Sequence, residues 1–330
     1  MNNKILVTGG SGFVGRFLIE ELLQESSDTI IAMYNNSGVP GVFKSSSGNL
    51  EWIKTDLVND DLSETLSGID VVYHLAGYST TESSPMELER LNNINVIATQ
   101  RLAEACMSSK VRHFVFVSSI AACESSLEPV IDERNGYPIT PYGDSKKRAE
   151  DILIERAKGS YELTILRPSA LFGEYHEGSV YELVKKIQEK RFLIFGSGKS
   201  LTNFLYIRDF SNLLVSVQLD SKAYGQVFIA ADKSFHLKIV VSWIVDALNS
   251  NLRVMAVPSW VGYILASIFD VVSLVLNRSL PFSRRRLAAM LNKTTYSNTK
   301  VTSIMGVDCK YGVRKGLLTT INWYRDSGML

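Results

Sequence analysis

Short runs of apolar residues alternate with helical segments through the first half of the chain. The runs that predict strands lie at 5–7, 29–33, 52–53, 71–76, 114–117 and 163–166. Unbroken apolar strands of this kind are typical of a parallel sheet that helices cover on both faces. The alternation therefore predicts a doubly wound α/β fold, whose ligand site lies at the carboxyl ends of the strands.

The segments between these strands carry apolar residues at spacings of three and four. The longest segment, from 85 to 108, places six of them on one stripe: Leu88, Leu91, Ile94, Ala98, Leu102 and Ala105. Such a stripe predicts one continuous helix that packs against the sheet. A second helix is expected from 142 to 156, directly before the strand at 163–166.

After Pro168 the pattern becomes less regular and mainly helical. We therefore predict a dinucleotide-binding Rossmann domain over 1–173, to which 205–231 returns, and a smaller, mainly helical substrate-binding lobe over 174–330. The elements expected after Pro168 are a helix at 180–190 and strands at 204–207 and 227–230.

The first apolar run leads into a glycine-rich turn, Thr8-Gly9-Gly10-Ser11-Gly12-Phe13-Val14-Gly15. A strand, a glycine turn and a helix in this order form the first unit of a dinucleotide-binding fold. Gly9 allows the tight turn, Gly12 lets the backbone approach a pyrophosphate, and Gly15 lets the helix pack closely on the strand. The amides and the positive dipole end of this helix favour phosphate groups.

Three polar residues further along predict acid/base chemistry. Tyr142 and Lys146 lie four positions apart in a predicted helix, so the phenol and the ammonium share one face. A phenol with a pKa of about 10 is a poor base at neutral pH, and a nearby lysine favours the phenolate. Ser119 follows the strand at 114–117 and can hydrogen-bond a substrate carbonyl beside the phenol. Each residue alone also fits an ordinary surface or capping role, but together with the glycine turn they occur in the order that one active site needs.

The composition excludes several classes of protein. A formal net charge of +1 over 330 residues argues against a nucleic-acid binder. Cys106, Cys123 and Cys309 are far apart and odd in number, so we expect no disulfide framework and no metal site, and a reducing compartment is favoured. Because the chain begins with a core strand, we expect no signal peptide and a cytoplasmic location.

The combined motifs resemble the extended short-chain dehydrogenase/reductases, in the epimerase and 3β-hydroxysteroid dehydrogenase branch. The resemblance covers essentially the whole chain and implies an NAD(P)-dependent enzyme. Besides the glycine turn, the matching residues are Asp56-Leu57, His74-Leu75-Ala76, Asn95, Ser118-Ser119, Tyr142 through Lys146, Leu166-Arg167-Pro168 and Phe204 through Asp209.

The resemblance also implies a role for each residue of the site. Tyr142 is the acid/base, Ser119 orients the substrate oxygen, and Lys146 lowers the pKa of the phenol and holds the nicotinamide ribose. Asn95 supports the active-site helix. The residues implied to bind the cofactor are Gly9, Ser11, Gly12, Phe13, Val14, Gly15, Asp56 and Leu57 at the adenine, Ala76 in the cofactor groove, Tyr142, Lys146, and Pro168 near the carboxamide.

One departure from the family pattern concerns the cofactor. Family members that select NAD usually carry an acidic residue at the end of the second strand, for the adenosine ribose. The stretch from 32 to 37 holds no carboxylate here. We therefore expect NAD(P), with NADP slightly favoured and with Arg16 or the Asn35-Asn36-Ser37 turn near a 2′-phosphate. That turn also fits ordinary loop chemistry, so both nucleotides stay open.

Three further departures concern the substrate. Ile120-Ala121-Ala122 follows Ser119 at the place where the 4,6-dehydratases carry an Asp-Glu pair, so dehydration is not expected. Thr202-Asn203 stands where many nucleotide-sugar enzymes have an arginine for the diphosphate, and Lys199 or the arginines at 284–286 could replace it. Cys123-Glu124 replaces the usual Tyr-Gly.

An apolar stretch from 260 to 276 is the most unusual part of the lobe. It is shorter than the ~20 apolar residues of a membrane span, and Asp270 interrupts it. With the basic cluster behind it, the segment 260–286 fits a peripheral contact with the inner face of the membrane. We favour a helix packed in the lobe or a dimer contact. Together with 178–183, the stretch is similar to bacterial epimerases that act on polyprenyl-diphosphate-linked amino sugars, and also to the apolar lobe of steroid-type members.

These observations predict an NAD(P)-dependent oxidoreductase acting at C4 of a diphosphate-linked sugar, as a small-molecule substrate. The main expectation is a 4-keto-6-deoxysugar reductase in bacterial surface polysaccharide synthesis, because the missing carboxylate favours an exchanged NADP. The alternatives are a sugar 4-epimerase, with a nucleotide or polyprenyl-diphosphate carrier, and a 3β-hydroxysteroid dehydrogenase-like enzyme. A non-enzymatic NAD(P) sensor is disfavoured, because Ser119, Tyr142 and Lys146 are all present. The resemblance also implies a homodimer.

Overall fold

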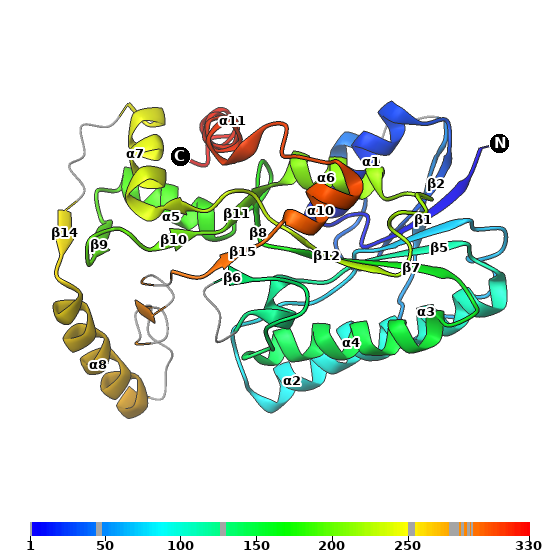
Figure 1. The fold of residues 1–330 in the computed structure, drawn as a ribbon, viewed down its shortest axis with the longest axis horizontal. Helices are drawn as coiled ribbons and strands as arrows, with labels where there is room; N and C mark the ends of the chain where they lie inside the picture. Colours follow the sequence, from blue (N-terminus) through cyan, green and yellow to red (C-terminus); the bar gives the residue numbers. More distant parts are fainter. Residues whose placement is uncertain are drawn as a thin grey trace. The chain divides into compact units, whose positions relative to one another are not determined.

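The computed structural model describes residues 2–43, 48–125, 130–249, 255–276, 284, 287–288, 291 and 293–330. The chain forms two compact units, each made of several stretches (Figure 1). Unit 1 comprises Met1–Ser169, Ile207–Ala231 and Ser297–Lys310; unit 2 comprises Ala170–Tyr206, Asp232–Tyr296 and Tyr311–Leu330. The units are defined by packing alone, so the two domains expected from the sequence stay a prediction.

Unit 1 is built on a parallel sheet of seven strands in the order β12-β7-β5-β4-β1-β2-β3. The strands are β1 (Lys4–Thr8), β2 (Thr29–Tyr34), β3 (Leu50–Lys54), β4 (Val71–His74), β5 (His113–Val117), β7 (Glu162–Pro168) and β12 (Gln226–Ala230). The winding reverses between β1 and β4, and in such sheets this is the point where a ligand binds. The predicted doubly wound α/β fold is confirmed, including the return of 227–230 to the sheet.

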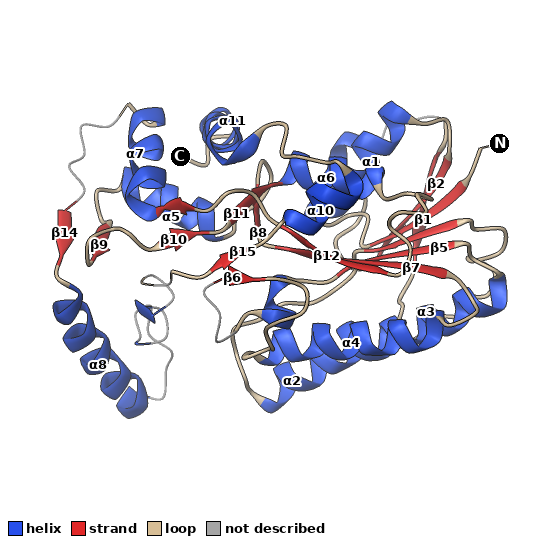
Figure 2. Cartoon of the chain, viewed as in Figure 1, coloured by secondary structure: helices blue, strands red, loops and turns tan. Residues whose placement is uncertain are grey.

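Helices cover both faces of this sheet, with α1 and α6 on one face and α2, α3 and α4 on the other (Figure 2). The strand residues between them are apolar because they are buried on both sides; Ile5, Leu6 and Val7 are 0% exposed. The remaining elements of unit 1 are α1 (Phe13–Glu25), η1 (Gly41–Phe43), α2 (Pro85–Leu91), η2 (Asn92–Ile97), α3 (Ala98–Ser109), η3 (Ile120–Cys123), β6 (Val130–Ile131), α4 (Pro141–Ala157), α6 (Ile207–Ser216) and α10 (Thr299–Met305).

The segment from 85 to 109 is helical, but it is not the single regular helix that its stripe predicts. η2 is a π-helical segment between α2 and α3. Its wider turn shifts the buried face along the sequence. Leu88 is therefore 42% exposed, whereas the polar residues Asn95 and Thr99 are buried.

Two expected strand ends are also wrong by one or two residues. β4 stops at His74, before Ala76. The strand expected at 204–207 ends at Tyr206, and the next residue already begins α6. In each case the apolar pattern continues into the loop or helix that follows, so the pattern alone cannot locate the end of the hydrogen-bonded ladder.

Unit 2 combines short strand pairs with longer helices. β8 (Ala170–Phe172) pairs with β11 (Phe204–Tyr206), β10 (Leu201–Thr202) with β13 (Phe235–His236), and β9 (Leu193–Phe195) with β14 (Met255–Val257). The other elements are α5 (Ser179–Gln188), α7 (Leu237–Ala247), α8 (Ser259–Leu276), β15 (Thr295–Tyr296) and α11 (Gly312–Asp326).

The helix α11 packs tightly on β11, because a Cβ at Gly316 would lie 2.6 Å from the ring of Tyr206. The Tyr206 hydroxyl group donates in turn to Glu174 at 2.9 Å. Within the described part of the chain, no helix has the length and apolar character needed to cross a membrane.

Candidate active site

The loop after β1 and the start of α1 form a cradle of bare backbone at the carboxyl edge of the sheet. Gly9 has a φ of +67°, and a Cβ there would lie 2.8 Å from the amide nitrogen of Ala76. A Cβ at Gly15 would collide with the carbonyl group of Gly9. Gly12 is the N-cap of α1, which has no side-chain cap and no acidic residue in its first turn. A helix start of this kind favours an anion, so the cradle fits the pyrophosphate of a dinucleotide.

The glycine turn contacts the turn that follows β2. The amide of Gly10 donates to the carbonyl group of Met33 at 2.9 Å, and the Oγ atoms of Ser11 and Ser37 lie 2.8 Å apart. The amide side chains at 35–36 are exposed. The turn therefore offers hydroxyl and amide groups, and no carboxylate, on the side of the cradle where the ribose site is expected.

Asp56 lies two residues beyond β3 and uses its carboxylate within its own turn. Its Oδ2 accepts from the side chain of Asn59 at 3.0 Å, and its Oδ1 accepts from the amide of Val58 at 2.9 Å. These two bonds hold the pKa of the Asp56 carboxyl group below its usual range. Leu57 packs against the buried core of the sheet. Asp56 and Leu57, which are expected to border the adenine, thus hold the loop after β3 in one shape.

Ser119, Tyr142 and Lys146 meet at the carboxyl end of β5. Ser119 is the N-cap of η3, and its Oγ accepts from the amide of Ala121 at 3.2 Å. Tyr142 and Lys146 lie one turn apart near the start of α4. Burial raises the pKa of the Tyr142 phenol, and the hydrogen bond from Ser119 offsets part of that rise. The structure therefore brings together the three residues that the sequence predicted to act together.

The Lys146 side chain is 4% exposed, and its ammonium group lies against the end of β5. Nζ donates to the carbonyl group of Val117 at 2.8 Å and lies 4.6 Å from the centre of the Phe116 ring. Burial lowers the pKa of Lys146 to about 8, and the nearby Glu150 opposes this shift. The group is therefore still mostly protonated at neutral pH, as a residue that stabilises a phenolate must be.

The cradle and the lysine are joined by two consecutive residues after β4. Ala76 lies against Gly9, and a Cβ on Gly77 would lie 3.4 Å from Nζ of Lys146. The loop after β4 thus contacts both the glycine cradle and the Lys146 ammonium group. A dinucleotide needs a continuous groove between its phosphate site and its nicotinamide site, and this loop provides one wall of it. Pro168, the last residue of β7, pairs with β12 further along the same edge.

Asn95 connects the π segment to the start of α4. Its Nδ2 donates to the carbonyl group of Tyr78 at 2.8 Å and to Oγ of Ser145 at 2.9 Å, and its Oδ1 accepts from the amide of Tyr78 at 2.7 Å. Ser145 donates in turn to the carbonyl group of Tyr142 at 2.7 Å. The amide is saturated by these contacts, so it can hold the backbone of the Tyr142 turn in one position.

His74 fills the end of β4 as a structural group. Its Nδ1 lies 2.7 Å from Oγ1 of Thr8, and its Nε2 lies 2.9 Å from Oγ1 of Thr99. Burial, with a smaller effect of the Lys146 charge, lowers the pKa of the imidazole to about 3. The ring is therefore neutral at physiological pH and ties β1, β4 and α3 together.

A buried ion pair, which was not predicted from the sequence, lies one turn beyond Lys146. Nε and Nη2 of Arg167 donate to the two carboxylate oxygens of Glu150 at 2.9 and 2.7 Å. Ser118 donates to the same carboxylate at 2.5 Å. Because Ser118 precedes Ser119 and Glu150 follows Lys146 by four residues, the pair braces both sides of the site. The sequence signal for this ion pair was Glu150, an acidic residue four positions after Lys146 and therefore on the same face of the predicted helix.

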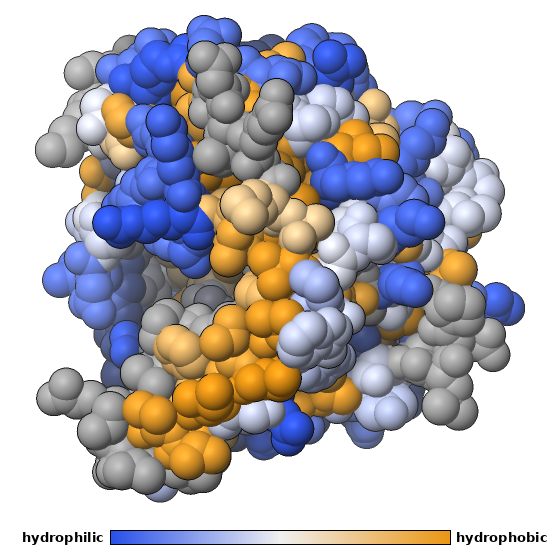
Figure 3. Space-filling view, turned by 90° about the vertical axis from the view of Figure 1, so that its left-hand side faces the viewer, coloured by the Kyte–Doolittle hydropathy of each residue, from blue (hydrophilic) through white to orange (hydrophobic). Residues whose placement is uncertain are grey.

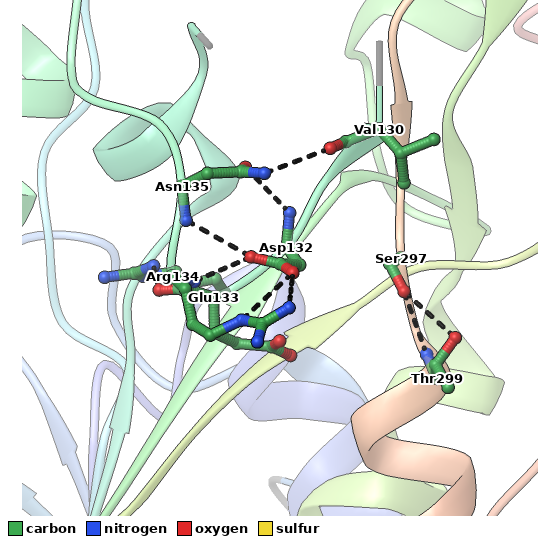
Figure 4. A network of polar contacts seen from close by, with 8 residues as sticks. Val130, Asp132, Glu133, Arg134, Asn135, Ser297 and Thr299 are labelled. Atoms are coloured by element: carbon green, nitrogen blue, oxygen red, sulfur yellow. Dashed lines mark hydrogen bonds and ion pairs between the residues drawn. The ribbon is translucent and has the colours of Figure 1, made fainter. Parts of the chain in front are cut away.

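The loop after β6 is tied to this ion pair. Figure 4 shows how Asp132 folds the loop: its carboxylate accepts from the amides of Arg134 at 2.9 Å and Asn135 at 3.2 Å. The side chain of Glu133 accepts from a backbone amide of β12 at 2.8 Å. The Glu133 carbonyl group accepts from Arg167 at 3.5 Å. The loop, the ion pair and the last strand of the sheet thus form one connected polar network.

An edge of this kind defines a class, the dinucleotide-binding α/β enzymes. The family within that class is shown by comparison with known sequences. Residues 5–229 match the NAD dependent epimerase/dehydratase family, and the chain belongs to this family. The resemblance stated from the sequence is confirmed, and the protein is an NAD(P)-dependent enzyme of the short-chain dehydrogenase/reductase group.

Sugar 4-epimerases are among the relatives that match most of the chain. The chain is 27% identical over 328 residues to N-acetyl-alpha-D-glucosaminyl-diphospho-ditrans,octacis-undecaprenol 4-epimerase of Escherichia coli O157:H7, covering 98% of this chain and 96% of the relative. It is 29% identical over 285 residues to UDP-glucose 4-epimerase of Vibrio cholerae, covering 83% and 85% of the two chains. Its fold resembles UDP-glucuronic acid 4-epimerase from Bacillus cereus in complex with NAD, with a TM-score of 0.78, 22% identity and coverage of 98% and 99%.

These comparisons change the balance between the predicted activities. They favour the epimerase alternative over the 4-keto-6-deoxysugar reductase, which was the main expectation. They give no support to a preference for NADP, since the family description names NAD. The expected homodimer and the expected membrane contact stay predictions.

Proposed function

We propose that the chain is a 4-epimerase of a diphosphate-linked sugar. The observation that carries the proposal is the acid/base group Tyr142, which is hydrogen-bonded to Ser119 and lies one helical turn before the buried Lys146, on an edge shaped for a dinucleotide. A relative that shares nearly the whole length of the chain is named as a 4-epimerase of a diphospho-linked sugar, which supports the same reaction.

In this proposal the phenol of Tyr142 takes the proton from the C4 hydroxyl group and later returns it. Ser119 donates a hydrogen bond to the oxygen of the 4-keto sugar, and the ammonium group of Lys146 stabilises the phenolate. When bound, the nicotinamide supplies reversible hydride transfer at C4. Epimerisation results when the ketone turns over between the two transfers, so the side chains must hold its oxygen in both orientations.

The cofactor would be NAD, kept through the reaction cycle. The glycine cradle would hold the pyrophosphate, and the loop from Ala76 to Gly77 would line the groove between the phosphates and the nicotinamide. The residues assigned to the cofactor in this proposal are Gly9, Ser11, Gly12, Phe13, Val14, Gly15, Asp56, Leu57, Ala76, Tyr142, Lys146 and Pro168.

The structure around Ser119 supports epimerisation over dehydration. The three residues after it are apolar, and Ala122 is buried under η3. A Cβ at Gly143 would collide with the carbonyl group of Ala121, so α4 lies directly against this segment. Neither Ile120 nor Ala121, directly after Ser119, can protonate a leaving hydroxyl group, so the acid that dehydration needs is missing from these two positions.

The proposal is tested on purified protein without added cofactor. Native mass spectrometry followed by denaturation should release NAD at near-full occupancy. The protein should interconvert the C4 epimers of an N-acetylhexosamine on a UDP carrier or on a polyprenyl-diphosphate carrier, followed by chromatography of the released sugars. Comparing the two carriers identifies the natural one.

Tyr142→Phe is the matched variant for this test. It should retain the bound nucleotide and lose activity by roughly 10²- to 10⁴-fold, because only the proton-transfer group is removed. An empty site that oxidises NADPH with a 4-keto-6-deoxysugar, and epimerises neither substrate, would instead establish the reductase. A Tyr142→Phe variant as active as the wild type would remove Tyr142 from the mechanism.

A further inference from the structure

The outer face of α8 is covered by large apolar side chains. Seven of them expose between 38% and 64% of their surface: Trp260, Tyr263, Ile264, Leu265, Ile268, Val271 and Val272. Most of them recur at helical spacings of three and four, so they form one continuous stripe along the helix. This stripe lies in the apolar band low in Figure 3. We call these seven residues the α8 stripe.

The opposite face of α8 carries small residues and packs into unit 2. A Cβ at Gly262 would lie 2.7 Å from Cδ1 of Phe195 and 3.1 Å from Cδ1 of Leu287. Ala266 is 0% exposed. A helix that only filled the core would bury its large side chains and expose its small or polar ones. α8 instead leaves seven large apolar side chains exposed while Gly262 and Ala266 are buried, which marks its outer face as a contact surface.

The charge of the surrounding segment is strongly positive. Residues 247–296 contain six basic side chains and one acidic side chain, a formal charge of +5. The rest of the chain is left with 29 basic and 33 acidic residues, a charge of −4. The single acidic residue of the segment, Asp270, accepts a hydrogen bond from the backbone amide of Arg284 at 3.3 Å. The side chain of Arg284 is exposed. Positive charge therefore stands directly beside the α8 stripe.

We propose that α8 lies in the interface of an anionic lipid bilayer, with its stripe in the acyl boundary and Arg284 at the headgroups. An apolar helical face beside arginines binds such a surface without crossing it. Trp260 and Tyr263, at the start of the helix, have the amphipathic rings that favour the boundary between lipid and water. The proposal does not rest on the proposed epimerase activity.

The charge distribution favours a lipid surface over a second copy of the chain. Two copies that met symmetrically through α8 would bring together two exposed Arg284 side chains, each beside an α8 stripe. Like charges close together at an interface oppose association, whereas anionic headgroups neutralise them.

Sedimentation of the wild-type protein with vesicles of phosphatidylglycerol and phosphatidylcholine tests this inference. The protein should bind, and binding should fall at high salt and with phosphatidylcholine alone. The double variant Ile264→Asp, Ile268→Asp should bind at least about tenfold more weakly, because it places two charges in the acyl boundary. Leu318→Asp is the matched control, since Leu318 is an isolated leucine, 41% exposed, on α11 of the same unit.

Trp260 provides a direct probe that does not depend on the double variant. Brominated lipids in the vesicles should quench tryptophan fluorescence of the wild type, and Trp260→Phe should remove most of the quenching. Wild-type protein that fails to bind anionic vesicles would overturn the proposal. A dimer that Ile264→Asp, Ile268→Asp converts to a monomer, with no vesicle binding, would assign the stripe to a second copy instead.

Discussion

Two helices of this chain depart in opposite directions from the usual rule for which side chains a helix buries. α4 buries polar and charged groups: Ser145, Lys146 and Glu150 are 4% exposed or less. α8 exposes its large apolar residues and buries Gly262 and Ala266. Each departure is confined to one face of its helix, so each marks a particular surface of the molecule.

The difference lies in what surrounds the unusual residues. On α4, each buried polar group has a partner within the described structure: Lys146 meets a carbonyl group, Glu150 meets Arg167, and Ser145 meets Asn95. These partners offset the cost of burial, which is large for an unpaired charge. The α8 stripe gains free energy when another apolar surface covers it. Buried polar groups that have partners thus indicate a catalytic site, whereas a stripe of exposed apolar groups indicates a surface that binds another molecule.

The largest effect is expected where α4 depends on its partners. Arg167→Met leaves the Glu150 carboxylate buried without its cation and should lower the free energy of unfolding by about 3–5 kcal/mol. The double variant Glu150→Met, Arg167→Met should recover most of this loss, because neither charge of the pair is left buried without its partner. Urea unfolding measures both. A single variant as stable as the wild type would show that the ion pair does not brace the site.

A somewhat smaller effect is expected from the buried ammonium group. An unfolded lysine titrates at 10.5, whereas burial lowers the pKa of Lys146 to about 8 in the folded chain. Between these values the unfolded chain holds the proton and the folded chain does not, so stability rises with pH from about 8 to about 10.5. The gap corresponds to about 3 kcal/mol, present in full as a penalty below pH 8.

Lys146→Met removes this titration. Relative to the variant, the wild type should therefore become more stable by about 3 kcal/mol as the pH rises through that window. Urea unfolding of both proteins between pH 7 and pH 10 tests the expectation. Parallel stability curves would mean that Lys146 keeps an ordinary pKa in the folded chain.

A third test compares one glycine from each helix. A Cβ at Gly143 on α4 meets the backbone of Ala121, which cannot move aside, whereas a Cβ at Gly262 on α8 meets the side chains of Phe195 and Leu287. Gly143→Ala should cost about 2–3 kcal/mol and Gly262→Ala about 1 kcal/mol or less, since side chains can shift. Thermal unfolding of the two variants compares them directly. Equal losses would show that α8 is held as rigidly as α4.

The smallest effect is expected on the outer face of α8. Ile268 is 53% exposed, so Ile268→Ser should change the free energy of unfolding by less than about 0.5 kcal/mol. Leu153, on the buried side of α4, is 0% exposed, and Leu153→Ala should cost about 2–5 kcal/mol. A large loss from Ile268→Ser would mean that the stripe is covered within the folded chain.

The parts that could be predicted from the sequence are those with local signals. The strands, the glycine turn and the spacing of Tyr142 and Lys146 depend on neighbours in the sequence, and the sheet and the Ser119 contact agree with them. The Glu150–Arg167 pair joins two elements that only the fold brings together. The π segment could not be predicted either, because its buried residues, Asn95 and Val96, lie outside the apolar stripe that predicts a single regular helix.

The π segment determines where this stretch can change in length. Its wider turn accommodates one more residue than an α-helical turn. Removing one residue there and closing the turn to α-helical geometry would leave α2 and α3 in nearly the same rotational phase. A deletion within α2 or α3 has no wide turn to absorb it and would rotate the residues before it by about 100° relative to those after it. Within this stretch, the π segment is therefore the place where a one-residue change in length does least to the packing of the two helices.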